Sequence, residues 1–168
     1  MSGGPLTPET TASAFAGMLG DLRRLIEETR AAVAAAANAG LTLLYWRIGQ
    51  RINQELLKGK RADYGQQILA TLSQQLTLDY GAGFGYTALT RMVSFAERFP
   101  DAGIVATLSQ QLSWSHFREL LPLDKPLQRE FYAEMCRVER WSVRTLRQRI
   151  GSLLYERTAL SRQPEELA

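Results

Sequence analysis

The amino-acid sequence predicts an all-α fold: a single compact helical domain of seven or eight helices with helix-turn-helix-like units. Three observations support this prediction. Apolar residues recur at helical spacing in one segment after another, and no stretch alternates apolar and polar residues as a half-buried strand does. Residues typical of helix caps and helix ends separate these segments. A chain of 168 residues is long enough for one domain of this kind.

The N-terminal third predicts a tail followed by two helices. Residues 1–10 contain two prolines and two glycines, and we expect them to form a flexible tail. Residues 11–37 are rich in helix-forming residues, and Asn38-Ala39-Gly40 is expected to end or bend that helix. An amphipathic helix over residues 41–57 follows, and Lys58-Gly59 is expected to close it.

Capping residues and turn residues place the remaining helices. Their expected starts are, in order, Asp63, Thr87, Asp101, Ser113, Asp124 and Ser142. The glycine-rich segment 81–85 is a turn, and Pro100 and Pro122 each stop the helix before them. Residues 161–168 resemble the start of a linker. The helical domain is therefore expected over residues 11–160.

The composition excludes several kinds of site. Apolar residues make up 45% and charged residues 22% of the chain, which argues against wholesale disorder. The single cysteine, Cys136, leaves no partner for an internal disulfide and is expected to be a small buried hydrophobe. The single histidine, His116, excludes a pair of histidine metal ligands. We therefore expect no cofactor, no metal and no catalytic site in this chain.

The sequence contains no signal that directs the chain to a membrane or out of the cell. The longest uncharged stretch, Ala31 to Trp46, is too short to span a bilayer. Residues 1–20 contain no basic residue and so lack the first part of a signal peptide. We expect a cytoplasmic protein with no membrane partner.

One short segment of the sequence is repeated. The segment Ala70–Thr77 returns almost unchanged as Ala106–Ser113, thirty-six residues later. A turn and a new helix are expected after each copy, which gives two helix-turn-helix-like units, and the second helix of such a unit can enter a DNA groove. The side chains expected on these second helices are Thr87, Thr90 and Arg91 in the first unit and Ser115, His116, Arg118 and Glu119 in the second. Any two capped helices joined by a short turn give the same pattern, so a purely structural unit remains an alternative.

Arginine dominates the positive charge and gathers in one segment. Seventeen of the twenty basic residues are arginine, and residues 137–149 hold five arginines and one acid. Arg140, Arg144 and Arg147 recur at helical spacing and could neutralise several phosphates, while Trp141 could stack on an unpaired base. The alternative is a solvated face that pairs with neighbouring glutamates, with Trp141 in the core.

Several short runs occur in an order typical of one bacterial family. They are Leu44–Gly49, Tyr64-Gly65, Asp79-Tyr80-Gly81, Gly83-Phe84, Phe95–Pro100, Gln111–Phe117, Pro126–Tyr132, Arg140–Leu146 and Tyr155–Thr158. Together they resemble the N-terminal domain of the YhcG-type family, a domain of unknown function, over about Leu25 to Leu167. The resemblance implies a helical DNA-binding or assembly module that precedes a nuclease domain of the PD-(D/E)xK type.

Two details of the sequence bear on that resemblance. None of the three lysines has an aspartate or glutamate two residues before it, so the carboxylates that bind the nuclease metal are expected beyond residue 168. Family members often carry basic residues just after the glycine turn, whereas this chain has Gly85-Tyr86-Thr87-Ala88. This difference weakens the case for phosphate binding by the first unit.

The leading hypothesis is a non-catalytic nucleic-acid-binding domain, most simply for DNA, that targets a nuclease domain in cis. Its expected binding residues are Ser115, His116, Arg118, Arg140, Arg144 and Arg147. The alternative hypothesis is a protein-interaction module that forms a homodimer without contacting DNA. It rests on the alanine-rich stretch Ala31–Ala37, which lets helices approach closely.

Overall fold

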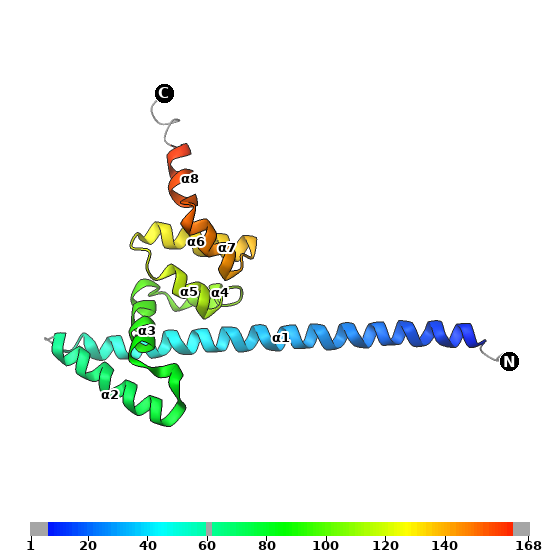
Figure 1. Ribbon diagram of the computed structural model, residues 1–168, viewed down its shortest axis with the longest axis horizontal. Helices are drawn as coiled ribbons and strands as arrows, with labels where there is room; N and C mark the ends of the chain where they lie inside the picture. The colour runs from blue at the N-terminus through cyan, green and yellow to red at the C-terminus, as the bar shows by residue number, and fades with distance from the viewer. Residues whose placement is uncertain (1–6, 60–61, 163–168) are drawn as a thin grey trace. The chain divides into compact units, whose positions relative to one another are not determined.

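The computed structural model describes residues 7–59 and 62–162, and every regular element in them is a helix (Figure 1). The elements are α1 (Pro8–Leu56), α2 (Ala62–Tyr80), the short 3-10 helix η1 (Ala82–Phe84), α3 (Tyr86–Arg98), α4 (Ala102–Leu108), α5 (Trp114–Leu120), α6 (Pro126–Glu139), α7 (Val143–Gly151) and α8 (Leu154–Arg162). The all-α prediction is confirmed.

The contacts within the chain divide it into two units, Met1–Ala37 and Asn38–Ala168. The described residues of the first unit, from Pro8 to Ala37, form the first part of α1, and all of them except Leu19 are exposed. All the buried side chains of the described residues belong to the second unit. The hydrophobic core is therefore built by the second unit alone.

Helix α1 does not end where the sequence suggested. It continues through Asn38-Ala39-Gly40, so the predicted break at these residues is wrong. The side-chain amide of Asn38 donates hydrogen bonds to the carbonyls of Ser109 (3.4 Å) and Leu112 (3.2 Å), so it does not compete with the helix backbone. Glycine costs a helix only about 1 kcal/mol relative to alanine, and the packing of the turns that follow outweighs that cost.

The two ends of the chain differ in part from the expected tail and linker. Residues 1–6 and 163–168 lie outside the described residues. Pro8 to Thr10 belong to the first turn of α1, and Ser161 and Arg162 to the last turn of α8. The sequence did not predict α8 as a separate helix. Two predicted helices, 11–37 and 41–57, are one helix in α1, so the described residues still contain eight α-helices.

Three of the six expected helix starts are true caps. Asp101 Oδ1 accepts hydrogen bonds from the N–H groups of Gly103 (2.8 Å) and Ile104 (3.1 Å). Ser113 and Ser142 cap α5 and α7 through their hydroxyl groups. These caps could be read from the sequence because they depend only on residues within three positions along the chain.

The other expected starts need correction by one or two residues. Asp63 lies in the first turn of α2, and α3 begins at Tyr86, one residue before Thr87. The N-cap of α6 is Lys125, because Pro126 occupies the first helical position, where its missing N–H costs nothing. Asp124 instead lies 3.5 Å from the guanidinium of Arg98.

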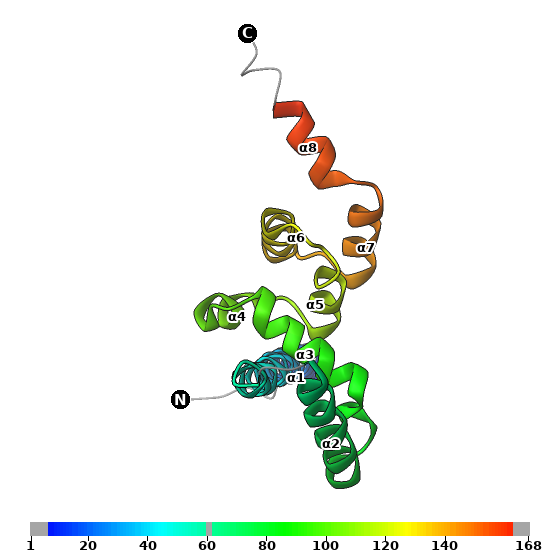
Figure 2. The ribbon, with the colours of Figure 1, turned by 90° about the vertical axis from the view of Figure 1, so that its left-hand side faces the viewer.

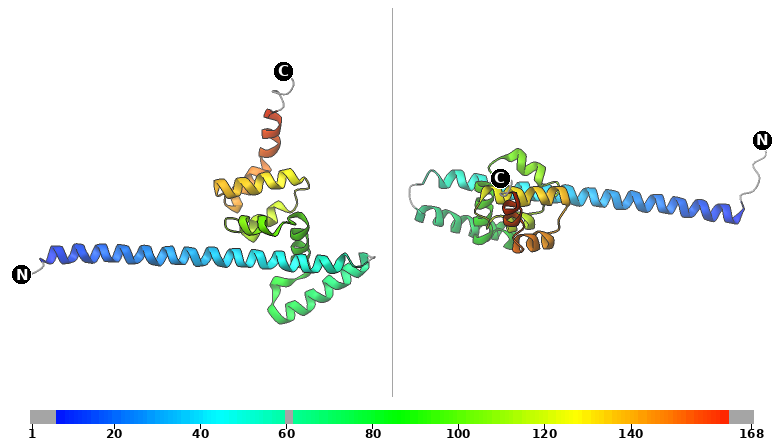
Figure 3. Two further views of the ribbon diagram at one scale, coloured as in Figure 1. Left: turned by 180° about the vertical axis from the view of Figure 1, so that it is seen from behind. Right: turned by 90° about the horizontal axis from the view of Figure 1, so that it is seen from above.

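A small buried cluster joins the last turns of α1 to α2 and α3. It comprises Ile52, Leu69, Leu89, Met92 and Val93. Helix α2 runs back beside the end of α1 (Figure 3). Gly49 lets α1 approach α3 closely, since a Cβ atom at this position would overlap the backbone carbonyl of Met92.

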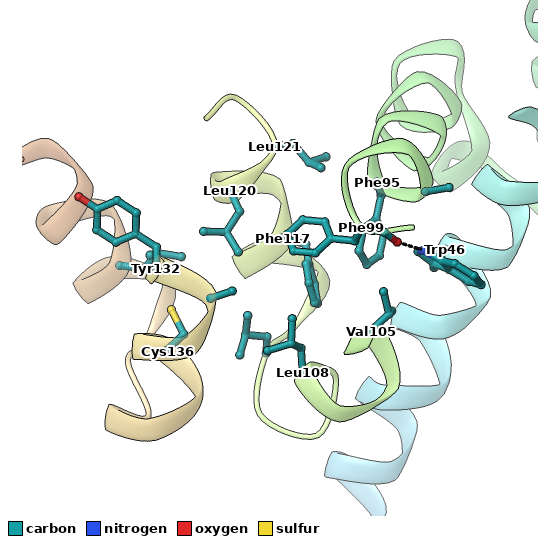
Figure 4. Close-up of a cluster of buried hydrophobic side chains, with 14 residues drawn as sticks. Trp46, Phe95, Phe99, Val105, Leu108, Phe117, Leu120, Leu121, Tyr132 and Cys136 are labelled. Atoms are coloured by element: carbon teal, nitrogen blue, oxygen red, sulfur yellow. Dashed lines mark hydrogen bonds between the residues drawn. The ribbon is translucent and has the colours of Figure 1, made fainter. Parts of the chain in front are cut away.

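A larger buried cluster joins α1, α3, α4, α5, α6 and α7, and aromatic rings form its centre (Figure 4). The rings of Phe95 and Phe117 lie 4.5 Å apart, and those of Phe99 and Phe117 lie 5.3 Å apart in an edge-to-face contact. The indole Nε1 of Trp46 donates a 2.7 Å hydrogen bond to the carbonyl of Phe99, so the one polar atom of this buried ring is satisfied. The cluster thus fixes the end of α3 against α1.

The C-terminal helices complete the second unit. Helix α5 lies between α3 and α6, and α7 leads into α8 (Figure 2). The hydroxyl of Tyr132, a fully buried residue of α6, accepts a 3.0 Å hydrogen bond from the N–H of Tyr155 at the start of α8. Burial raises the pKa of Tyr132 above its ordinary value.

The close approach at Gly49 can be tested by substitution. We expect Gly49→Ala to lower the free energy of unfolding by at least about 1–3 kcal/mol, because α1 and α3 must move apart. Gly40→Ala is the matched control, since a Cβ there meets nothing within 4 Å. It should raise the free energy of unfolding by about 0.5–1 kcal/mol. Urea denaturation measures both, and equal effects of the two substitutions would contradict the packing described.

Candidate nucleic-acid interface

The repeated octapeptide adopts two different structures. Its first copy, residues 70–77, lies wholly within α2. In the second copy, residues 106–108 end α4 and residues 109–113 form the turn before α5. Helix α4, this turn and α5 make the helix-turn-helix-like unit that the sequence suggested. The first copy leads to a comparable arrangement only after eight further residues, 78–85, through η1 to α3.

His116 closes the turn of the second unit from inside the protein. Its Nδ1 accepts a 3.0 Å hydrogen bond from the N–H of Ser113, while the Ser113 hydroxyl accepts one from the N–H of His116, which together form a capping box. The other ring nitrogen, Nε2, therefore carries the proton and donates it to the carbonyl of Trp141 at 2.7 Å. His116 is only 8% exposed. The expectation that His116 is an exposed side chain of the second helix is wrong, because it is buried and connects α5 to the segment before α7.

Three helices of the second unit border an open groove of about 490 Å³. The lining residues are Thr90, Arg91 and Ser94 from α3, Ser115, Arg118, Glu119, Leu121 and Pro122 from α5 and the residues after it, and Val143 and Arg147 from α7. Three of them are arginines and one is an acid. We call this feature the arginine groove.

The arginine groove contains only part of the residue set expected from the sequence. Ser115, Arg118 and Arg147 line it, although they come from two different predicted features. Arg140 and Arg144 are exposed but do not line it. Arg140 is the C-cap of α6 in the left-handed conformation, with φ of 53°, so it does not share one continuous helix with Arg144 and Arg147.

Arg91 is the one arginine of the groove that the expected binding set omits. The sequence predicts Arg91 only as a side chain on the second helix of the first unit. Phosphate binding by that unit is disfavoured because no basic residue follows the glycine turn directly. The structure brings Arg91 to the same groove as Arg118 because α3 and α5 share the aromatic cluster. A contact between segments so far apart in the chain leaves no local pattern in the sequence.

The charges of the groove are partly paired. Arg147 donates to Glu119 Oε1 from Nη2 at 2.7 Å and from Nε at 3.2 Å, and this contact raises the pKa of Arg147. The arginine side chain remains 65% exposed. Arg91 and Arg118 take part in none of the ion pairs formed among residues 7–59 and 62–162. The groove therefore carries two arginines that form no ion pair with any carboxylate of the described residues.

The rest of the arginine-rich segment is engaged in other contacts. Arg137 forms an ion pair with Glu134 on its own helix, with 2.9 Å between Nε and Oε2. The guanidinium carbon of Arg149 lies 5.6 Å from the ring centre of Trp141. Trp141 is half-buried against the larger cluster. Its ring is thus packed partly against the core, with the guanidinium of Arg149 beside its face.

Two further observations on the described residues concern metal binding and cysteine chemistry. None of their histidine, cysteine, aspartate and glutamate side chains forms a group of three or more that could hold a metal ion. Cys136 is buried, as expected, and burial raises the pKa of its thiol to about 12. No helix among the described residues is long and apolar enough to cross a membrane.

Comparison with protein families identifies the family of the chain. A family model described as the DUF1016 N-terminal domain matches residues 21–157, a range that includes the whole arginine groove. The chain belongs to this family. The DUF1016 N-terminal domain is thus an all-α unit in this protein, and the family resemblance inferred from the sequence is confirmed.

A curated relative extends the comparison. The chain is 30% identical to the Escherichia coli (strain K12) protein named "Putative nuclease YhcG", over an alignment of 183 positions. This alignment covers 91% of the chain and 49% of YhcG, so the chain spans about half the length of that relative. No solved structure matches the chain. The DUF1016 N-terminal domain is therefore found in a protein associated with nuclease function.

The structural role of His116 predicts a loss of stability rather than a loss of contact. His116→Ala removes the donor to the Trp141 carbonyl and one half of the capping box. We expect the free energy of unfolding to fall by about 1–3 kcal/mol. Ser115→Ala, at the neighbouring exposed residue, should change it by less than about 0.5 kcal/mol in urea denaturation. A stable His116→Ala protein with weakened DNA binding would restore the contact role.

The burial of Cys136 predicts an unreactive thiol. A raised pKa means that the thiolate is the disfavoured form, so at pH 8 a thiol with a pKa of about 12 is ionised in about one molecule in ten thousand. We expect Ellman's reagent to modify the native protein only through transient opening, and to react completely in concentrated urea. Rapid modification of the folded protein would show that Cys136 is accessible.

Proposed function

We propose that this domain is a non-catalytic DNA-binding module that holds duplex DNA in the arginine groove and delivers a nuclease domain of the same polypeptide to it. One observation carries the proposal. Arginines from three helices that are distant in sequence, Arg91, Arg118 and Arg147, converge on a single open groove with only Glu119 opposing them.

The chemistry of the groove lining suits the phosphate backbone. A guanidinium group presents its N–H donors in a planar fork that matches two phosphate oxygens, and it stays charged at any physiological pH. The hydroxyls of Ser94 and Ser115 line the same groove and can donate to further phosphate oxygens, whereas the Thr90 hydroxyl already donates to the carbonyl of Tyr86. Contacts of this kind position a protein on DNA without reading its sequence. The proposal is therefore one of backbone binding, with Ser115 and Arg118 available for base edges.

The exposed arginines outside the groove extend the proposed surface. Arg144 precedes Arg147 on α7, and Arg140 lies just before that helix. In this proposal they contact phosphates beyond the groove and contribute to affinity through counterion release. His116 makes no DNA contact, and its part is to keep α5 aligned with the segment before α7.

The nuclease part of the proposal is supported by the relative. YhcG carries the word nuclease in its name and extends well beyond the region that this chain matches. A helical domain with a phosphate-binding groove and no metal cluster among its described residues would complement such a partner. Binding would raise the local concentration of the nuclease domain on its substrate.

Fluorescence anisotropy with labelled duplex, four-way-junction and single-stranded DNA, at several salt concentrations, tests the proposal. We expect the wild-type chain to bind duplex DNA with an affinity that falls steeply with salt. Arg91→Ala combined with Arg118→Ala should weaken binding roughly tenfold or more and lower the salt slope by about two, because two phosphate contacts are lost.

Two further variants make this test specific. Arg47→Ala combined with Arg51→Ala removes the same charge from exposed positions of α1 outside the groove, and it should bind nearly as well as the wild type. Glu119→Gln removes the carboxylate that pairs with Arg147, and it should bind more tightly. Equal losses in both arginine pairs would show a nonspecific charge effect, and no binding at low salt by the folded chain would overturn the proposal.

A further inference from the structure

The first unit exposes a stripe of apolar side chains along one helix. Phe15, Met18, Leu22, Leu25 and Ile26 are each about half exposed, between 48% and 59%, and none of them belongs to a buried cluster. Single exposed apolar residues are common, but a contiguous row of large ones marks an interaction surface. This stripe serves no purpose in the DNA-binding proposal.

The stripe follows the seven-residue repeat of a coiled coil. From Phe15 onward its members are spaced alternately by three and four residues, and they are Phe15, Met18, Leu22, Leu25, Thr29, Ala32 and Ala36. A second row, Leu19, Ile26 and Val33, repeats every seven residues beside it. The spacing of 3.5 residues brings such a row to the same side of a helix over three heptads, a length of about 33 Å. We call the two rows together the apolar seam.

We propose that the apolar seam of one chain binds the apolar seam of a second copy, as a parallel, in-register helix pair. A heptad seam is built to be covered by another helix with the same repeat, because its knobs fit the holes between residues of a like helix. The seam narrows from large side chains at Phe15–Leu25 to alanines at Ala32 and Ala36, where two copies can approach closely. In a parallel, in-register pair the large side chains of one copy lie opposite the large side chains of the other, and the alanines lie opposite the alanines.

The charges beside the seam select the parallel direction. One edge of the seam carries Asp21 and Glu28, seven residues apart, and the other edge carries Arg23 and Arg30. In a parallel pair, opposite edges of the two helices meet, so the acidic edge of each copy faces the basic edge of the other. In an antiparallel pair, like edges meet, and acid would face acid. The four charges therefore favour the parallel pair by attraction and disfavour the antiparallel pair by repulsion.

Three of these four charges, those of Asp21, Glu28 and Arg30, also form exposed ion pairs along the same helix. Arg24 lies 3.3 Å from Asp21 and 4.0 Å from Glu28, and Arg30 lies 3.9 Å from Glu27. Such pairs at three- and four-residue spacing support an isolated helix. Every one of these side chains remains at least 65% exposed, so both edges can still reach a partner helix.

This inference goes beyond the proposed function and stands independently of it. The sequence alone pointed to the alanine-rich stretch as the reason for self-association, whereas the larger side chains of the seam lie before it. The seam lies wholly within the first unit, Met1–Ala37, and shares no residue with the arginine groove. Loss of DNA binding and loss of pairing are therefore separately measurable.

Sedimentation equilibrium of the whole chain tests the pairing. We expect the wild-type chain to have twice the mass of a single chain, and Leu22→Glu combined with Leu25→Glu to leave it monomeric with the core intact by near-UV circular dichroism. Ala31→Glu combined with Ala34→Glu is the matched control, because it adds the same charge on the face of the helix opposite the seam and should remain dimeric. A monomeric wild type at high concentration, or a dimer that survives the seam variant, would overturn the proposal.

A cysteine cross-link tests the direction. In a parallel, in-register pair, Met18→Cys places two thiols opposite each other, and mild oxidation should convert most of the chain into a disulfide-linked dimer. Ala34→Cys, on the outer face, should not cross-link, and the buried native Cys136 does not interfere. Failure of Met18→Cys to cross-link in a dimeric sample would contradict the parallel arrangement.

Charge exchange tests the edges. Asp21→Arg with Glu28→Arg makes both edges basic, and Arg23→Glu with Arg30→Glu makes both acidic. Each double variant should dissociate at concentrations where the wild type is dimeric, and an equimolar mixture of the two should form heterodimers. If the separate variants remain as dimeric as the wild type, these edges do not meet in the pair.

Discussion

The hydrogen bond from the indole of Trp46 to the carbonyl of Phe99 is the contact on which the rest of the second unit depends. Phe99 is the C-cap of α3, where helix carbonyls lack partners within the helix. A buried indole N–H also needs an acceptor. One contact therefore satisfies two polar groups and fixes the end of α3 on α1. The ring of Phe99 packs against Phe117 and thereby positions α5 next to α3. The distance between Arg91 on α3 and Arg118 on α5 therefore depends on this core contact.

A second buried ring completes the same arrangement on the other side of α5. His116 donates to the carbonyl of Trp141, just before α7, as Trp46 donates to the end of α3. Both contacts join an aromatic N–H to a backbone carbonyl at a helix boundary, where the carbonyl has no helical partner. The pair of Arg147 and Glu119 also joins α7 to α5, but it adds little stability, since ion pairs at the surface contribute little. Buried hydrogen bonds between neutral groups thus determine the shape of the groove, and exposed arginines give it its positive charge.

The sequence predicted those features that depend on near neighbours. The caps at Asp101, Ser113 and Ser142 require only residues within three positions, and all three are present. The break expected at Asn38 failed because its amide bonds to the distant carbonyls of Ser109 and Leu112. The same contact holds the second octapeptide copy in a turn, while the first copy stays helical in α2. The two copies differ only at their last residue, Thr77 or Ser113, yet they have different tertiary partners and adopt different structures.

The candidate site shows the same division between local and distant causes. Arg118 and Arg147 could be named from helical spacing, but their meeting with Arg91 is a consequence of how α3, α5 and α7 pack. The apolar seam is the opposite case, because a heptad repeat is wholly local and would have been readable from residues 15–36 without a structure. Its large residues precede the alanine-rich stretch Ala31–Ala37, which contributes only the last, small members of the seam, Ala32 and Ala36. A surface made by one helix can be read from spacing, whereas a surface made by three helices requires their packing to be known.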